Sequence, residues 1–134
     1  SEQARENEVP EESIEKTPEE YQNISFDDFV EYSKSMFEYW TEDDFASSFR
    51  KMLTIEQFRS EEMQKLYQQY LVAGPASYVK ALFESIGIVN AKDKAARFYA
   101  VMHFYYSLYD GAADKEKVKV EFVSAIKSLV QDLA

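Results

Sequence analysis

The sequence contains no cysteine, one histidine, three glycines and three prolines among its 134 residues. Without cysteine there can be no disulfide scaffold, thiolate zinc site or cysteine nucleophile. A single histidine also leaves little basis for histidine-rich metal sites or catalytic triads. So few glycines and prolines argue against a phosphate-binding loop or a turn-rich β fold. We therefore expect no enzymatic activity, no metal and no cofactor.

Positive charge is also scarce, with 15 Lys and Arg against 25 Asp and Glu and a net charge of −10. That sign argues against nucleic-acid binding by this chain through phosphate contacts. No apolar run approaches the ~20 residues of a membrane-spanning helix, so no membrane is expected as a partner. The acidic N-terminus lacks the basic and apolar regions of a signal peptide, and we expect a cytoplasmic protein.

The acidic residues are concentrated at the start of the chain. Residues 1–22 carry eight acids and two bases and contain Pro10 and Pro18, which interrupt helices. We expect an acidic, partly ordered leader over residues 1–22. Residues 23–134 should form one helical domain, since hydrophobic residues make up 46% of the chain.

Helical patterns dominate that domain, and no alternating strand pattern is present. Apolar residues recur every three or four positions, and capping residues stand in front of several of these stretches. The sequence predicts an all-α fold, an orthogonal bundle of about six helices. Their expected starts are Ser25, Thr41, Ser60, Gly74-Pro75, about Lys92 and Asp114.

The last two predicted helices carry more apolar surface than one neighbour can cover. Positions 95 to 109 are apolar or aromatic except for Arg97, His103 and Ser107, and the final helix has two apolar stripes. A helix that is apolar all round must be covered all round. We predict a homodimer in which these two helices of each chain form a four-helix bundle; the alternative is a central core helix. The candidate interface residues are Tyr106, Tyr109, Val118, Phe122, Ile126, Leu129, Val130 and Leu133.

Aromatic residues are abundant, with ten Tyr, ten Phe and one Trp. Tyr and Trp combine apolar area with a hydrogen-bonding group, which suits a pocket for a flat or amphipathic ligand. The alternative is that these rings simply fill the core. The candidate ligand-binding residues are Phe37, Trp40, Phe49, Tyr67, Tyr70, Tyr78, Phe83, Phe98, Met102 and Tyr105.

Two further features suggest metal or proton chemistry but have simpler explanations. The acidic groups Asp27-Asp28-Glu31 and Glu42-Asp43-Asp44 match no calcium-loop spacing and are expected at helix N-termini. His103 is either a ligand-binding or titrating group, or a satisfied core or interface residue. Ala100 stands three residues before it, where helical di-iron proteins carry Glu.

Two stretches resemble a known family. LTIEQFRSEEMQKLYQQYLVAGPASYVKALFESI (Leu53–Ile86) and ARFYAVMHFYYSLYDGA (Ala96–Ala112) are similar to the C-terminal domain of TetR/AcrR-type transcriptional regulators. The resemblance covers roughly Ser25–Ala134. It implies an all-helical regulatory domain that dimerises through its last two helices. It also implies a small-molecule effector, bound in an internal cavity, that changes the spacing of two DNA-reading heads.

The chain departs from that family at its N-terminus, because residues 1–24 contain no helix-turn-helix. We therefore expect a fragment whose parent binds DNA through a missing N-terminal domain. The alternative function is a free-standing helical interaction module whose aromatic groove receives a partner. The two hypotheses differ in whether the aromatic side chains point inward or outward.

Overall fold

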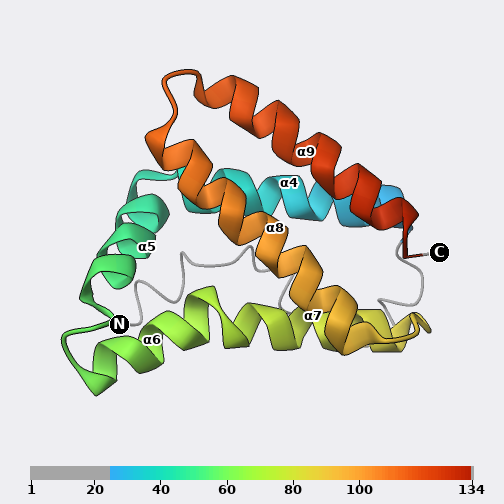
Figure 1. Cartoon of the computed structure of the whole chain (residues 1–134), viewed down its shortest axis with the longest axis horizontal. Helices are drawn as coiled ribbons and strands as arrows, with labels where there is room; N and C mark the ends of the chain where they lie inside the picture. Colours follow the sequence, from blue (N-terminus) through green and yellow to red (C-terminus); the bar gives the residue numbers. More distant parts are fainter. Residues whose placement is uncertain (1–24, 134) are drawn as a thin grey trace.

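The computed structural model describes residues 25–133, which form six α-helices and no strand (Figure 1). The all-α prediction is confirmed for these residues, whereas the predicted leader over 1–22 lies outside them. The helices are α4 (Phe26–Glu42), α5 (Asp44–Glu56), α6 (Glu61–Leu71), α7 (Ala73–Ser85), α8 (Ala91–Gly111) and α9 (Lys115–Gln131).

Capping side chains explain where most of these helices begin. At α4, the Asp28 N–H donates to Ser25 Oγ at 3.1 Å, and the Ser25 N–H donates to the Asp28 carboxylate at 3.3 Å. Ser60 and Asp114 likewise accept a backbone N–H at the starts of α6 and α9. Each cap satisfies a donor that has no partner within the helix.

The predicted cap at Thr41 is wrong. Thr41 belongs to the last turn of α4, where its hydroxyl donates to the Phe37 carbonyl at 2.6 Å. The cap of α5 is Asp43, whose carboxylate accepts from the Ala46 N–H at 2.8 Å. A threonine whose hydroxyl bonds to the carbonyl four residues back is not available to cap the next helix, and the capping side chain here stands two residues later.

Helices α6 and α7 follow one another along one side of the molecule (Figure 1) and are separated at Val72, whose φ and ψ are −133° and −88°. Helix α7 begins at Ala73, two residues before Pro75, instead of at the proline. A Cβ on Gly74 would collide with the Gln69 carbonyl oxygen. The close approach of the two backbones therefore requires glycine at this position.

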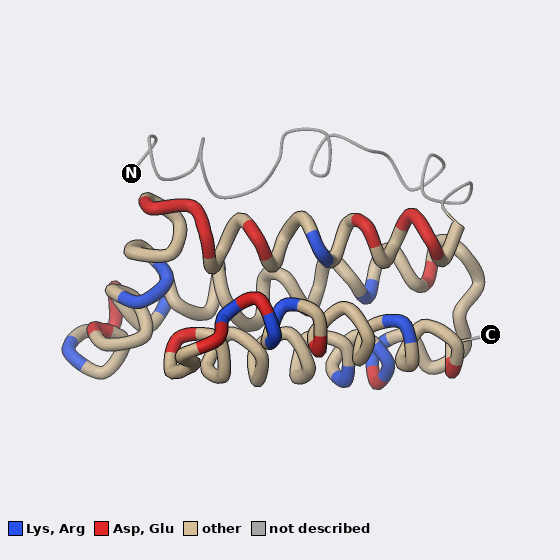
Figure 2. The backbone as a smooth tube through the Cα atoms, turned by 90° about the horizontal axis from the view of Figure 1, so that it is seen from above, with Lys and Arg blue, Asp and Glu red and all other residues tan. Residues whose placement is uncertain are grey.

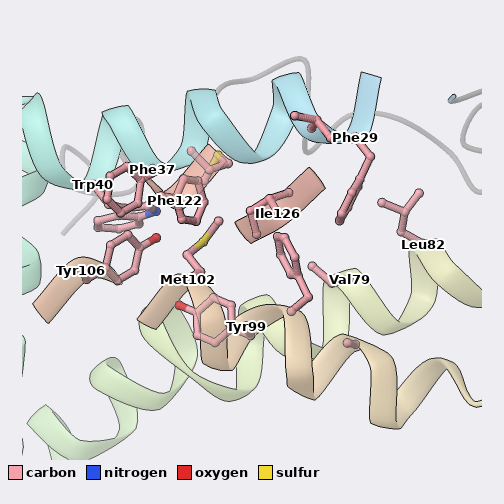
Figure 3. Packing of buried hydrophobic residues seen from close by; sticks show 14 of the residues in the cluster. Phe29, Phe37, Trp40, Val79, Leu82, Tyr99, Met102, Tyr106, Phe122 and Ile126 are labelled. Atoms are coloured by element: carbon pink, nitrogen blue, oxygen red, sulfur yellow. The ribbon is translucent and has the colours of Figure 1, made fainter. Parts of the chain in front are cut away.

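Helix α8 lies at the centre of the fold and contacts α4, α7 and α9. Its inward side packs into a core that is dominated by rings and branched aliphatic side chains (Figure 3). The Phe37 ring of α4 stacks on Phe122 of α9 with 4.2 Å between centroids, and on Tyr106 of α8 at 5.6 Å. These stacked rings join three helices.

Acidic positions recur along the backbone of α4 (Figure 2), and Lys34 is the one basic residue in the sequence of this helix. Part of this charge is balanced by Lys119 of α9, whose ammonium lies 2.7 Å from Glu38 and 3.0 Å from Glu42. The hydrogen bond to Glu38 raises the pKa of Lys119. The ion pairs attach the outer edge of α9 to α4.

A buried arginine joins the middle of α5 to the ends of α4 and α8. Arg50 of α5 is 5% exposed, and its two terminal nitrogens donate to the Asp110 carboxylate of α8 at 2.7 and 2.9 Å. Its Nε donates to the Trp40 carbonyl of α4 at 2.9 Å, and its guanidinium lies 5.0 Å from the Tyr106 ring centroid. Trp40 provides one of the last carbonyls of α4, which have no partner within that helix. We call this group, Arg50 with Asp110, Trp40 and Tyr106, the Arg50 clamp.

Removal of Asp110 from the clamp should destabilise the fold strongly. Asp110→Ala leaves a buried guanidinium without its counter-ion, and we expect it to reduce the free energy of unfolding by about 3 kcal/mol. The control is Asp93→Ala, which removes the exposed partner of Arg97 and should cost less than about 1 kcal/mol. Urea unfolding followed by circular dichroism measures both. Equal losses in the two variants would contradict a stabilising role for the clamp.

Candidate functional site

A cavity of about 240 Å³ lies between α4, α6, α7 and α8. This volume exceeds the roughly 150 Å³ that accommodates benzene and is below the range of about 300–1,000 Å³ typical of drug-sized ligands. The lining residues are Tyr32, Met36 and Trp40 from α4, Gln69 and Tyr70 from α6, Gly74, Pro75, Tyr78 and Val79 from α7, and Phe98, Tyr99, Met102 and Tyr106 from α8.

The walls of the cavity are aromatic, and none of these lining residues is Asp, Glu, Lys, Arg or His. Seven of them carry an aromatic ring, and Met36 and Met102 add flexible thioethers. The polar groups of the lining side chains are the tyrosine hydroxyls, the Trp40 N–H and the Gln69 amide. This composition suits a flat molecule that is mostly apolar and carries a hydrogen-bonding group.

The hydroxyls at the α8 wall stay protonated. Burial raises the pKa of Tyr106 well above its usual value, and the neighbouring Tyr99 and Tyr32 raise it further, while Arg50 opposes them. The pKa of Tyr99 is also raised, first by burial and then by Tyr67 and Tyr32. Both groups are therefore phenols, able to donate a hydrogen bond, at any physiological pH.

Five of the ten predicted ligand-binding residues line this cavity, namely Trp40, Tyr70, Tyr78, Phe98 and Met102. Two others are core residues: Phe37 is stacked between Phe122 and Tyr106, and Phe83 packs on Phe29 at 5.3 Å between centroids. Both are fully buried by side chains of their own chain. The prediction that these two bind ligand is not supported by their position.

The remaining three predicted residues lie outside the cavity lining. Phe49 of α5 packs on the outer side of Tyr70, with 5.5 Å between ring centroids, and Tyr105 meets the Phe122 ring edge-on at 5.8 Å. Tyr67 lies beside His103. Helix α5, which carries Phe49, contributes no residue to the lining, and Tyr105 stands one position before the lining residue Tyr106, a difference that periodicity alone did not resolve.

The cavity includes eight residues that were not predicted: Tyr32, Met36, Gln69, Gly74, Pro75, Val79, Tyr99 and Tyr106. The sequence spacing could have identified Tyr32 and Met36. Together with Trp40 they recur at intervals of four residues and therefore share one side of α4. For Gly74 and Pro75 the sequence offered no comparable signal. They line the cavity because α6 and α7 meet there.

The predicted dimer interface stays a prediction, but most of its residues face the core of a single chain. Six of the eight are buried there, at the contacts of α4, α8 and the α9 segment: Tyr106, Val118, Phe122, Ile126, Val130 and Leu133. Their side chains offer no surface to a second copy. Tyr109 and Leu129 are half-buried at the edge of the same core.

His103 lies on α8 just outside the cavity lining. Its Nε2 is 3.5 Å from the Tyr67 hydroxyl, and its ring lies 5.7 Å from Tyr99 and 6.0 Å from Tyr106. Burial lowers the pKa of His103 and the positive charge of Arg50 lowers it further. The imidazole is thus neutral at pH 7 and belongs to the aromatic layer behind the cavity.

Comparison with known proteins gives no family for the chain: no family model matches it, and neither curated proteins nor solved structures provide a match. Among residues 25–133, no helix combines the length and the apolar character needed to cross a membrane. The same part of the chain has no group of three or more His, Asp or Glu side chains placed to hold a metal ion.

The neutral His103 should make stability depend on pH. Since its pKa is below 6.5 in the folded chain, the unfolded chain binds a proton first as the pH falls below about 6.5. Folding stability should therefore decrease from pH 7.5 to 5.5 by more in the wild type than in His103→Gln. Urea midpoints at both pH values measure the difference. The two proteins have the same carboxylates, so these groups contribute equally to the pH dependence of both. A loss that is equal in both proteins would contradict a neutral His103.

Proposed function

We propose that this chain binds a small, flat, amphipathic molecule in the cavity between α4, α6, α7 and α8. The supporting observation is the lining itself, which combines seven aromatic rings with protonated tyrosine hydroxyls and contains no charged side chain. Together with the resemblance described above, this leads us to propose a role as the effector-sensing and dimerisation domain of a TetR-like transcriptional regulator.

The position of the cavity beside the Arg50 clamp supports a sensing role. Trp40 and Tyr106 both line the cavity, and both contact Arg50, one through its carbonyl and the other through its ring. A molecule that presses on either side chain acts on the junction of α4, α5 and α8. A ligand that binds one arrangement of this junction more tightly than another shifts the equilibrium between the two arrangements.

The cavity should bind 2-naphthamide, a neutral two-ring probe. We expect saturable heat in isothermal titration calorimetry and, at tenfold excess over Kd, a stabilisation of about 1.4 kcal/mol, or several degrees in Tm. Val79→Phe fills part of the cavity and should abolish binding without unfolding the protein. Val123→Phe makes the same change on α9, outside the cavity lining, and should leave binding intact. Absence of binding by the wild type, or equal binding by both variants, would contradict the proposal.

We also propose that a second copy of the chain covers the outward face of α8. Positions 98–109 contain no Asp, Glu, Lys or Arg, and this face exposes Ala100, Phe104 and Leu108. Phe104 is 59% exposed. If two α8 helices cross antiparallel about a two-fold axis between positions 100 and 104, Phe104 of each copy lies against the small Ala100 of the other. A two-fold interface requires such self-complementarity.

Disruption of this face should change the mass of the protein in solution. We expect a dimer for the wild type and a monomer for Phe104→Glu, because a carboxylate in the centre of an apolar contact loses its hydration. Phe58→Glu is the matched control, since Phe58 is 84% exposed on the turn between α5 and α6. Multi-angle light scattering measures all three. A monomeric wild type, or a dimer that survives Phe104→Glu, would contradict the proposal.

A further inference from the structure

We infer that the cavity selects an uncharged molecule of one or two rings that carries a hydrogen-bond acceptor, and that it rejects the same ring carrying a charge of either sign. This inference rests on the proposed binding function and specifies its ligand class. It is drawn from three observations: the uncharged lining, the engaged state of the nearest charges, and the hydroxyl donors at the α8 wall.

A buried ion needs a partner of opposite charge, and the lining supplies none. Transfer of an unpaired carboxylate or ammonium out of water is far more costly than transfer of a neutral polar group. The part of a molecule that lies against these residues loses its hydration. A charged ring therefore binds less tightly than a neutral ring of the same shape.

The ion pair beside the lining residue Tyr106 is already satisfied. Arg50 forms two hydrogen bonds with the Asp110 carboxylate and a third with the Trp40 carbonyl, and the Tyr106 ring lies against its guanidinium. To pair with an anion, Arg50 would have to release Asp110. To pair with a cation, Asp110 would have to release a buried guanidinium. Either exchange breaks the clamp.

Aromatic walls can also attract cations through their ring faces. In this cavity, however, the Tyr106 ring already carries the guanidinium of Arg50 at 5.0 Å from its centroid. A second cation beside Tyr106 would be repelled by the first. At Tyr106, stacking with a neutral aromatic molecule is therefore favoured over capture of an ammonium group.

The tyrosine hydroxyls define the polar part of the ligand. Tyr99 and Tyr106 stand two turns apart on α8, and Tyr32 of α4 is close enough to both to raise the pKa of each. Because Tyr99 and Tyr106 remain phenols, they present O–H donors to a carbonyl, amide or hydroxyl oxygen. A cavity volume of about 240 Å³ limits the apolar part of the ligand to one or two rings.

Three probes of nearly the same shape test the charge selection: 2-naphthamide is neutral, 2-naphthoate is an anion and 2-naphthamidine is a cation at pH 7.5. We expect the amide to bind about tenfold more tightly than either ion, as measured by calorimetry. If an ion binds as tightly as the amide, the inference is overturned while the binding function stands. If none of the three binds, the proposed function fails and the inference fails with it.

Removal of the Tyr99 hydroxyl tests whether the cavity recognises a hydrogen-bond acceptor. Tyr99→Phe keeps the ring and should weaken the binding of 2-naphthamide about three- to tenfold. The binding of naphthalene, which has no acceptor, should be unaffected. Tyr105→Phe makes the same change on α8 outside the cavity lining and should alter neither affinity. Equal affinities of the wild type for 2-naphthamide and naphthalene, or an equal effect of Tyr99→Phe on both, would overturn the role of the hydroxyls.

Discussion

The fold around the cavity depends on the bidentate ion pair between Arg50 and Asp110. It connects the middle of α5 to the end of α8, and the Nε of the same guanidinium satisfies a carbonyl at the end of α4. Helix ends leave such carbonyls unpaired, and a buried arginine with several rigid donors can pair them without water. Since Trp40 and Tyr106 both contact Arg50 and both line the cavity, the shape of the cavity depends on the clamp.

Helix α8 has two chemically different sides. Its inward side supplies Phe98, Tyr99, Met102 and Tyr106 to the cavity wall, and its outward side exposes an uncharged face centred on Phe104. A shift of the inward side on ligand binding would be carried by a rigid helix to the outward side. In the proposed function, this single helix connects the bound molecule to the second copy of the chain.

Sequence periodicity predicted which faces of the helices are apolar, but not which neighbour covers each face. The all-α fold and the caps at Ser25, Ser60 and Asp114 were predictable because both depend on local interactions. The stripe through Phe122 and Ile126 was assigned to a second chain, whereas α4 of the same chain covers it. Half of the predicted cavity residues lie outside the cavity for the same reason: a cavity is formed by the approach of helices that are distant in the sequence.

The central claim, a ligand cavity between α4, α6, α7 and α8, is tested most directly by the methionine methyl groups. The chain has four methionines, of which Met36 and Met102 line the cavity and Met52 and Met63 do not. With methyl-¹³C methionine and 2-naphthamide as the titrant, the account predicts saturable chemical-shift changes and contacts to the ligand at Met36 and Met102. Unchanged signals at these two methyl groups, or changes at Met52 or Met63 alone, would contradict it.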